Sequence, residues 1–536
     1  MFFSRAALTA RVAAFALFCA AGWPTRIGAV VPVDSGVPEF RAVTTNLDGS
    51  GITVAQPEAS LTTDMLTWEV NPAISAQTNV LFAYTTFDGT TNGFPNDVGF
   101  ESEHADAVGN IFYGAAYGIA PGVARVDNFE ADFFYENFLC NPNLPGTGDA
   151  VVNQSFTFGT LPPSDQEAVD SEYDNYSAQN QTLFISAANN LGDSPTVCAP
   201  GTAYNCISVG AYANGTYANS PGPTRDNGRC KPDLTAAGSE TSFSTPLVAG
   251  AAAVLMQAAL RGDAGTATND AADLRTLKAL LLNGAVKPPD WTNSCNSPLD
   301  ARYGAGVLNL LNAYEELAGG EHHFVSASRT PLGGPHPPDG TPGCIKTMSG
   351  WDFNTNTSDA ACDRINHYCF RPDAGPTHAP LGVTATLVWN RQLNQTSINN
   401  LSLFLYDCDN SNLVAGSTSV VDNVQHLHVA GLAPGRYDLQ VWKAGGTPGS
   451  NFVSSAETYS VAWAWVSPSL TMTMCGSSVA LSWPLYPAGF AVESSTNFFS
   501  SNWATNNLPV PIITNGENYL NINCRAPGQL FRLSSH

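Results

Sequence analysis

The feature that most constrains the fold is the spacing of hydrophobic residues along the first 318 positions. Between about residue 45 and residue 318, short runs rich in β-branched residues alternate with longer stretches rich in Ala and Leu. Strands that alternate with helices predict a mostly parallel sheet that is covered by helices on both faces. The predicted strands are residues 51–55, 80–84, 150–153, 182–186 and 206–210, and the clearest predicted helices are residues 245–261 and 271–283.

After residue 318 the spacing changes to the period of two that is typical of antiparallel strands. Residues 331–338, rich in Gly, Pro and His, are typical of a linker. Three apolar faces then follow at alternate positions: Val383, Ala385, Leu387 and Trp389; Leu401, Leu403 and Leu405; and Tyr437, Leu439 and Val441. This alternation predicts a β-sandwich over residues 321–466, and residues 467–536 are expected to form a small separate β module.

Composition excludes two classes of partner. The chain has 536 residues, with 45 Asp and Glu against 22 Lys and Arg, and its formal charge is −23. Nucleic acids and anionic membranes attract basic surfaces, and the chain has no basic run, so neither is expected as a partner. Because 43% of the residues are hydrophobic and only 12% are charged, the chain is expected to fold.

The first 29 residues have the pattern of a secretory signal. Residues 1–11 carry two arginines and no acid, residues 12–21 are apolar, and small residues permit cleavage after Ala21 or Ala29. The apolar run is too short to span a bilayer. We therefore expect a signal peptide at residues 1–29 and a secreted protein, extracellular or periplasmic, without a membrane span.

Export makes disulfides permissible, and 11 of the 12 cysteines lie after residue 29. Cys198 and Cys206 are close enough in the sequence to close a small loop, and so are Cys362 and Cys369, but the sequence does not define the connectivity. The odd number leaves at least one thiol unpaired or one pair between chains. None of the spacings has the pattern of a zinc site.

The segment richest in chemical information is residues 231–250. A turn of small residues leads into an apolar helix and delivers Ser242 to its start. At a helix start the free N–H groups and the helix dipole favour negative charge. A serine there can attack a carbonyl while its own N–H faces the developing oxyanion. The alternative role for Ser242 is to cap a buried helix.

This segment resembles the serine motif of the subtilisin-like serine peptidases, or subtilases. In that family Lys-Pro-Asp-Leu-x-Ala-Pro-Gly precedes Gly-Thr-Ser-Met-Ala-x-Pro-His-Val-Ala-Gly. Residues 231–238 match the first stretch except that Ala237 replaces proline, and two departures from the second matter: Glu240 for glycine and Leu247 for histidine. Residues 303–309 are similar to the segment that closes such domains. The resemblance implies a subtilisin-like three-layer α/β domain over residues 30–320, with Ser242 as its nucleophile.

Two further segments resemble blocks of the same family in the expected order. Residues 187–192 are similar to Ala-Ala-Gly-Asn-x-Gly, which implies that Asn190 is the side-chain donor of the oxyanion hole. A carboxamide suits this role because it supplies an N–H without a charge. An ordinary turn after a strand is the alternative for Asn190. Residues 150–155 resemble the strand that binds the substrate backbone, so Ser155 is expected to be substrate-binding.

His104 is expected to be the base. A serine nucleophile needs a base that titrates near pH 7, and imidazole is the usual one. Of the nine histidines, only His104 precedes residue 322. Residues 103–109 weakly resemble the family's His-Gly-Thr-His-Val-Ala-Gly, and residues 117–126 match the stretch that follows it. The alternative is a histidine on a helix surface.

The acid is the least well defined member of the predicted triad. The family's motif Val-Ala-Val-Ile-Asp-x-Gly has its nearest equivalent in residues 49–59, which places Glu58 where aspartate is expected. A glutamate can orient His104 if the backbone lies about one methylene further back. Asp88, after the run at residues 80–84, and Asp34 are the rival acids, and a purely structural Glu58 is a further alternative.

The β region also carries a resemblance. Residues 403–407 and 435–441 resemble the prepeptidase C-terminal domains that accompany secreted bacterial peptidases. Trp389, Trp442, Trp463 and Trp465 either form a binding surface there or belong to the core, which is the commoner place for such residues. The β modules are therefore candidates for binding a surface or a polymer.

Together, these features predict a secreted serine endopeptidase that hydrolyses peptide bonds of protein or peptide substrates. We expect no cofactor for the chemistry; structural calcium is common in the family, but no site for it is readable. Two alternatives stay open. One is a catalytically degenerate subtilase scaffold, exported as a binding or adhesion protein, which Glu240 and the altered acid motivate. The other is an esterase that uses the same site.

Overall fold

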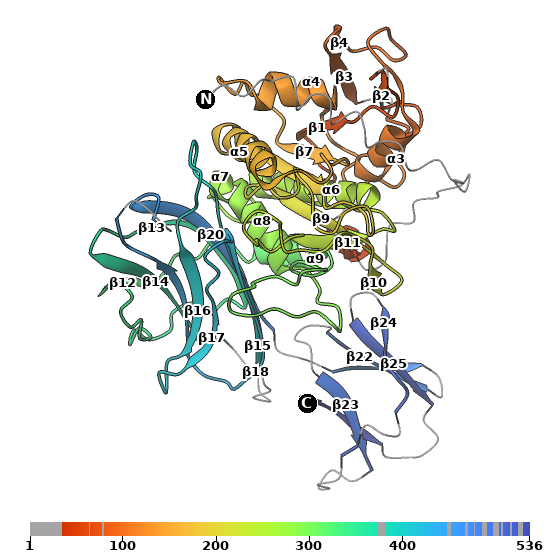
Figure 1. Ribbon diagram of the computed structural model, residues 1–536. Helices are drawn as coiled ribbons and strands as arrows, with labels where there is room; N and C mark the ends of the chain where they lie inside the picture. The colour runs from red at the N-terminus through yellow and green to blue at the C-terminus, as the bar shows by residue number, and fades with distance from the viewer. Residues whose placement is uncertain are drawn as a thin grey trace.

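The computed structural model describes residues 35–44, 46–63, 65–77, 80–372, 381–447 and 452–466, and, nearer the C-terminus, residues 470–475, 478–484, 490–496, 503–504, 508–514, 517–523 and 529–535. The expected signal peptide and Asp34 lie outside the described residues. Figure 1 shows an α/β domain, a stack of two β-sheets beside it, and a smaller β module that holds the C-terminus.

A nine-stranded sheet forms the centre of the α/β domain. Its strand order is β10-β9-β8-β7-β1-β6-β3-β4, and β11 also pairs with β9. All neighbours are parallel except the edge strands β4 and β10, which pair antiparallel with β3 and β9. The prediction of a mostly parallel sheet is confirmed. The strands are β1 (Thr53–Glu58), β3 (Leu81–Thr86), β4 (Gly89–Thr91), β6 (Arg125–Glu130), β7 (Val151–Gln154), β8 (Leu183–Ala187), β9 (Ile207–Ala213), β10 (Thr216–Tyr217) and β11 (Leu234–Ala237).

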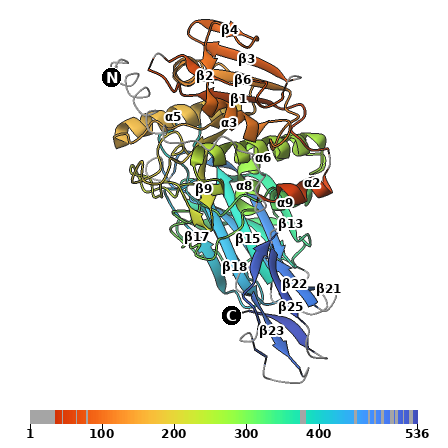
Figure 2. The same ribbon diagram turned by 90° about the vertical axis from the view of Figure 1, so that its right-hand side faces the viewer.

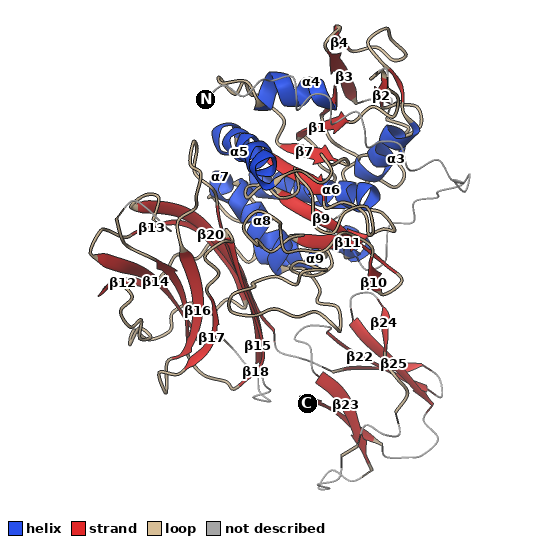
Figure 3. Cartoon of the chain, in the orientation of Figure 1, coloured by secondary structure: helices blue, strands red, loops and turns tan. Residues whose placement is uncertain are grey.

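Helices cover both faces of this sheet, as Figure 3 shows. Successive residues of a strand point to opposite faces. Val54 and Val151 accordingly pack into a cluster with residues of α3, α6, α8 and α9, whereas Ala55 and Val152 pack into a second cluster with residues of α4 and α5. The helices are α2 (Val37–Val43), α3 (Glu103–Phe112), α4 (Ala131–Phe134), the π-helical turn η3 (Tyr135–Leu139), α5 (Pro163–Asn180), α6 (Thr241–Arg261), α7 (Thr268–Ala271), α8 (Leu274–Asn283) and α9 (Leu310–Ala318).

Helix α6 is the core helix of the α/β domain. Its 21 residues have a hydropathy high enough for a membrane span, but 83% of the apolar window is buried inside the protein. Among the described residues it is the one helix that is long and apolar enough to cross a membrane. The sequence predicts this helix from residue 245, whereas it begins at Thr241, so Ser242 lies in its first turn.

Antiparallel sheets follow the α/β domain, as the sequence predicts. One sheet has the order β12-β14-β19-β16-β17 and the other the order β13-β20-β15-β18. Trp389, Trp463 and Trp465 are buried between them, whereas Trp442 is half-buried. The strands are β12 (Ser326–Pro331), β13 (Ser349–Thr357), β14 (Cys362–Phe370), β15 (Leu381–Trp389), β16 (Leu401–Asp407), β17 (Leu413–Ser417), β18 (Val424–Leu432), β19 (Tyr437–Lys443) and β20 (Ala456–Val466).

Strands β21–β26 form the C-terminal module, which Figure 2 shows at the opposite end of the molecule from the α/β domain. Four of them pair in the order β21-β22-β25-β24, and β23 pairs with β26. A two-stranded sheet, β2 (Thr67–Glu69) with β5 (Phe100–Glu101), completes the described pairing. The module's strands are β21 (Thr471–Cys475), β22 (Ser478–Pro484), β23 (Phe490–Ser495), β24 (Ile512–Thr514), β25 (Glu517–Asn523) and β26 (Leu530–Ser535).

The two disulfide loops considered from the sequence are not formed. Cys362 and Cys369 both lie in β14, where seven residues of extended chain separate them by roughly 23 Å, far beyond the reach of a disulfide. The thiol of Cys206 donates a hydrogen bond to Ser186 Oγ at 3.1 Å rather than bonding to Cys198. All nine cysteines that can be assessed in the described part of the chain are free thiols.

Candidate active site

The structure brings two of the expected site residues into direct contact. Glu58 is the last residue of β1, a central strand of the sheet, and His104 lies in the first turn of α3. His104 Nδ1 is 2.9 Å from Glu58 Oε2. The Glu58 side chain is 1% exposed and that of His104 is 20% exposed, so the contact is sheltered while the ring still reaches the surface.

The hydrogen bond to Glu58 defines the state of the imidazole. A carboxylate accepts hydrogen bonds, so Nδ1 carries the proton and Nε2 is left with a lone pair. Burial acts to lower the pKa of His104, but the charge and hydrogen bond of Glu58, together with the charge of Glu240, outweigh it and raise the pKa above its ordinary value. The ring is therefore arranged to take up a proton at Nε2.

Ser242 lies in the first turn of α6 and is paired with Ser155. Ser242 Oγ donates to the carbonyl oxygen of Ser155 at 3.1 Å, and Ser155 Oγ donates to the carbonyl oxygen of Ser242 at 2.8 Å. The backbone N–H of Ser242 has no acceptor among the described residues, as expected in the first turn of a helix. A free main-chain donor therefore lies on the serine itself.

Asn190 is tied to the same helix start. Its Oδ1 accepts from the N–H of Thr241 at 2.9 Å and from the hydroxyl of Thr241 at 3.0 Å. These bonds fix which end of the amide is oxygen and leave Nδ2 as a donor that has no protein acceptor within the described part of the chain. The turn before it uses Asn189 at φ 84°, a left-handed conformation that Asn tolerates better than most residues.

The first turns of α3 and α6 meet at the site. The rings of His104 and Phe243 are 5.9 Å apart between centroids, and Phe243 directly follows Ser242. Ser242 Oγ makes no hydrogen bond to His104 among the described residues, because the Ser242 hydroxyl donates to the Ser155 carbonyl oxygen instead. Glu240 lies immediately before α6, and its carboxylate makes no capping bond to the helix.

Of the two rival acids, one lies elsewhere and the other lies outside the described residues. Asp88 is exposed in the turn between β3 and β4, a hairpin at the edge of the sheet. Asp34 precedes the first described residue. Glu58 is therefore the acid that the described structure places against His104.

Sequence reasoning missed the residues that surround Glu58. Gln56 Nε2 donates to Glu58 Oε1 at 2.8 Å, and Tyr113 donates its hydroxyl to Gln56 Oε1 at 2.7 Å. One signal was available: Gln56 is a polar residue at a buried position of β1, and it lies two residues before Glu58, on the same face. Nothing in the sequence pointed to Tyr113.

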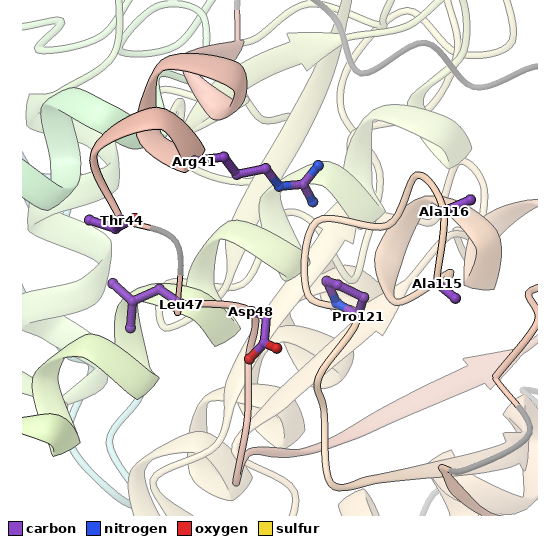
Figure 4. A pocket seen from close by; sticks show the side chains of 7 residues that line it. All are labelled: Arg41, Thr44, Leu47, Asp48, Ala115, Ala116 and Pro121. Carbon is purple, nitrogen blue, oxygen red and sulfur yellow. The ribbon is translucent and has the colours of Figure 1, made fainter.

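A hollow of about 300 Å³ beside α2 is separate from this site (Figure 4). It is lined by Arg41, Thr44, Leu47, Asp48, Ala115, Ala116 and Pro121. Residues 115–121 follow the last turn of α3, whereas His104 lies in its first turn, roughly 12 Å away along the helix at 1.5 Å per residue.

One group of side chains with the spacing of a metal site lies where the β-sandwich begins. The ligand atoms of Glu321, His323 and Asp352 lie within 4.8 Å of one another. His323 Nδ1 is already 2.9 Å from Asp352 Oδ1, and the other oxygen of Asp352 accepts from the Tyr368 hydroxyl at 2.6 Å. Both oxygens of the buried Asp352 carboxylate are therefore already bonded to protein side chains.

A second such group consists of Glu167, Asp170 and Asp226. Arg229 pairs with Asp170 at 2.7 Å and with Asp226 at 2.9 Å, and Arg391 pairs with Glu167 at 2.5 Å. Two guanidinium groups therefore supply the positive charge that a cation would bring. Neither group includes a residue of the candidate active site.

A known protein family matches a part of the chain that includes some of the candidate site residues. Residues 144–306 match the model described as the Subtilase family. This range contains Ser155, Asn190 and Ser242, whereas Glu58 and His104 lie before it. A search of curated proteins found no match. The subtilase resemblance is thus supported for residues 144–306, and the resemblance of the β-sandwich to prepeptidase C-terminal domains stays a prediction.

Similar solved structures include three proteases. The protease domain of PatA is 22% identical, with coverage of 52% of this chain and 98% of that chain and a TM-score of 0.36. A cold adapted subtilisin-like serine proteinase is 21% identical, with coverage of 45% and 85% and a TM-score of 0.31. MycP1 from Mycobacterium smegmatis is 17% identical, with coverage of 55% and 86% and a TM-score of 0.36. Likenesses of this strength say nothing about the site of this chain.

Proposed function

We propose that this chain is a serine endopeptidase of the subtilisin type that hydrolyses peptide bonds in protein or peptide substrates. The observation that carries the proposal is the 2.9 Å contact between His104 and Glu58, at a helix start that meets the helix start bearing Ser242. The match of residues 144–306 to the Subtilase family supports the same function from the sequence side.

In the proposed reaction, Ser242 Oγ turns from Ser155 toward His104 and attacks the scissile carbonyl carbon. His104 Nε2 takes the hydroxyl proton as the new C–O bond forms, and Glu58 stabilises the imidazolium that results. The proton then passes to the leaving nitrogen as the C–N bond breaks. Water, deprotonated by His104 in turn, releases the acyl group from Ser242 and completes the hydrolysis.

The oxyanion would be held by donors that are free in the structure. Asn190 Nδ2 and the N–H of Ser242 both lack protein acceptors in the described chain, and Asn190 is tied to Thr241, the neighbour of Ser242. The N-terminal end of α6 adds the positive end of its dipole. Free, preorganised donors of this kind are the usual source of transition-state stabilisation in acyl transfer.

Ser155 would contribute as a residue of the substrate-binding strand. It lies directly after β7 and shares two hydrogen bonds with Ser242. In the proposed reaction the Ser155 carbonyl releases the Ser242 hydroxyl when substrate arrives, while the bond from Ser155 Oγ keeps the backbone of Ser242 in place.

Casein hydrolysis tests the proposed function. The secreted form of the chain should degrade casein at pH 8, and Ser242→Ala and His104→Ala should each lose about 1,000-fold or more in kcat/KM. A wild-type chain that is folded but inactive would instead support the exported binding or adhesion scaffold. Faster turnover of short-chain esters, with casein left intact, would support the esterase.

We also propose that the protein is exported, on the basis of residues 1–29. N-terminal sequencing of the mature protein should begin at Gly22 or Val30. Retention of Met1 in protein recovered from an exporting host would contradict this proposal.

A further inference from the structure

The Glu58 carboxylate is held from two sides. Its Oε2 contacts His104 Nδ1 at 2.9 Å, and its Oε1 accepts from Gln56 Nε2 at 2.8 Å. Gln56 and Glu58 are two residues apart in β1, so both side chains leave the same face of the strand. The orientation of the carboxylate toward the histidine is therefore fixed by a neighbour as well as by the histidine itself.

All polar atoms of the Gln56 side chain are used. Besides Glu58, Nε2 donates to the carbonyl oxygen of Ala105 at 3.0 Å, and Oε1 accepts from the Tyr113 hydroxyl at 2.7 Å. A carboxylate and a peptide carbonyl can only accept, so the nitrogen must face them and the amide has one orientation. Gln56 and Tyr113 are fully buried, where a broken hydrogen bond is costly.

The same contacts tie β1 to the helix that carries the histidine. Ala105 directly follows His104 in α3, and Tyr113 directly follows Phe112, the last residue of α3. The Tyr113 phenol reaches Gln56 past Gly109, where an added Cβ would lie 2.6 Å from the hydroxyl oxygen. Gly109 thus leaves the space that the Tyr113 phenol occupies, and α3 contacts Gln56 near both of its ends.

A glutamate in this position needs such support more than an aspartate does. Its side chain has one more rotatable bond, so holding it in one orientation costs more conformational entropy. A carboxylate that swings away from His104 no longer orients the ring or stabilises the imidazolium. A second, buried hydrogen bond removes that freedom before substrate binds.

We propose that Gln56, oriented by Tyr113, is a positioning residue that holds the Glu58 carboxylate toward His104. This role deepens the proposed function and rests on it. Gln56 touches neither substrate nor the reacting atoms, so its effect on the reaction passes entirely through Glu58.

A double-mutant cycle tests the role. Gln56→Met keeps the length of the side chain but cannot hydrogen-bond, and it should lower kcat about 10- to 100-fold with KM within about twofold of wild type. In a Glu58→Ala background the same substitution should lower kcat by less than about twofold. Independent losses that multiply in the double variant would show that Gln56 acts structurally and would overturn the proposal.

A milder variant guards against misfolding. Tyr113→Phe removes a single hydroxyl and should also lower kcat. Combining it with Gln56→Met should lower kcat no further than Gln56→Met does alone. Tyr173→Phe is the matched control, because the buried Tyr173 hydroxyl also bonds a strand glutamine, Gln154, at 2.7 Å. That control should lose similar stability and keep its kcat; an equal loss of kcat in both tyrosine variants would contradict the proposal.

Failure of the proposed function is distinguishable from failure of this role. If the wild type hydrolyses no substrate, the function fails, and the role is then measured by NMR titration of His104. In Gln56→Met the pKa of His104 should fall, because the Glu58 carboxylate that raises it in the wild type is no longer held in contact; Glu240, the other charge acting on the ring, is unchanged. An unaltered pKa would overturn the positioning role.

Discussion

At the scale of single residues, the site is defined by which polar atoms are already bonded and which are free. The Glu58 carboxylate is bonded on both oxygens, and the side-chain amide of Asn190 is bonded through its oxygen alone. Within the described part of the chain, the free atoms are His104 Nε2, Asn190 Nδ2 and the N–H of Ser242. In the proposed hydrolysis, His104 Nε2 takes up a proton and the two free N–H donors bind the oxyanion.

The free amide of Asn190 gives the first prediction. Asn190→Ala should lower kcat about 100-fold or more and leave KM nearly unchanged, because an oxyanion donor acts on the transition state rather than on bound substrate. Steady-state kinetics on a peptide substrate measure this. A variant with a raised KM and an unchanged kcat would show that Asn190 binds the ground state instead.

Glu240 gives a prediction for pH dependence. Its charge contributes to the raised pKa of His104, and activity requires neutral His104, so activity appears as pH rises through that pKa. Glu240→Gln should therefore move the acidic limb of kcat/KM to lower pH. It should also raise kcat by up to about tenfold, because a carboxylate near the oxyanion opposes its charge.

The control for that pH profile is Glu103→Gln. Glu103 is exposed and adjacent to His104 in the sequence, but it is not among the charges that raise the pKa of the ring. The acidic limb of the kcat/KM profile of Glu103→Gln should match that of wild type. An acidic limb of Glu240→Gln that stays in place, or moves to higher pH, would contradict the assigned effect of Glu240.

The residues of the site differ in how far the sequence predicts them. Ser242, Asn190 and Ser155 lie within short motifs whose order along the chain is distinctive, so local sequence is sufficient to locate them. Glu58 and Gln56 depend on contacts with α3, which lies more than forty residues further along the chain. A local sequence pattern does not encode such contacts, so the role of Gln56 is apparent only from the structure.

At the scale of elements, helix starts hold the chemistry in place. The hydroxyl of Ser102 caps α3 by accepting from the N–H of Ala105 at 3.3 Å, and this is the turn that carries His104. Capping side chains stabilise a helix by about 1 kcal/mol. The cap of α3 is therefore coupled to the position of the proposed base.

Two cap variants separate stability from activity. In urea titrations Ser102→Ala should lower the free energy of unfolding by about 1 kcal/mol. Asp273→Ala should lower it by at least as much, because it removes the cap of α8 and an ion pair with Arg275. Only Ser102→Ala should also lower kcat, because α8 carries no residue of the site. Equal kcat values for the two variants would contradict a coupling between the α3 cap and the base.

Elements were predicted from the sequence where their hydrophobic pattern is strong. Strands β1, β3, β7, β8 and β9 lie at or within a few residues of the predicted runs. Helix α5 was missed because most of its residues are polar; it buries Val169, Tyr173 and Tyr176 at helical spacing among acids and amides. The start of α6 was placed four residues late because Ser and Thr in its first turn are also turn residues.

At the scale of the whole molecule, the α/β domain and the β-sandwich share buried contacts. Arg391, from the loop after β15, pairs with Glu167 at 2.5 Å and with Asp174 at 2.7 Å, both on α5. The Arg391 side chain is 1% exposed. Asn283, the last residue of α8, accepts from the hydroxyls of Thr384 and Thr386 in β15.

Breaking the buried pair should uncouple the two parts. Arg391→Ala leaves Asp174 buried without its cation and should lower the free energy of unfolding by about 3 kcal/mol. Calorimetry should then resolve separate transitions for the α/β domain and the sandwich. Arg436→Ala, which breaks an exposed pair with Asp409, should cost about 0.5 kcal/mol; equal costs would contradict a buried interface.

Buried acids make stability depend on pH. Burial raises the pKa of Glu457 to about 7, although hydrogen bonds from Asn399 and Gln392 oppose the shift. Because the folded pKa exceeds the unfolded one, the folded state binds the proton more tightly, and this contribution to stability is lost as pH rises through about 7. Glu457→Gln should therefore be more stable than wild type at pH 8 and nearly equal to it at pH 5.

Thermal unfolding of wild type and Glu457→Gln from pH 5 to pH 8 measures this difference. The two melting temperatures should diverge as pH rises. A gap that is constant, or that widens toward pH 5, would show that the Glu457 carboxylate is charged in the folded protein throughout the range.

The most direct measurement of the central claim is peptide mapping by mass spectrometry after treatment with a fluorophosphonate. The account predicts one adduct at pH 8, on the peptide that contains Ser242, with labelling reduced at least about 100-fold in His104→Ala. No adduct on folded wild-type protein between pH 6 and pH 10, or an adduct at Ser242 that forms equally fast without His104, would contradict it.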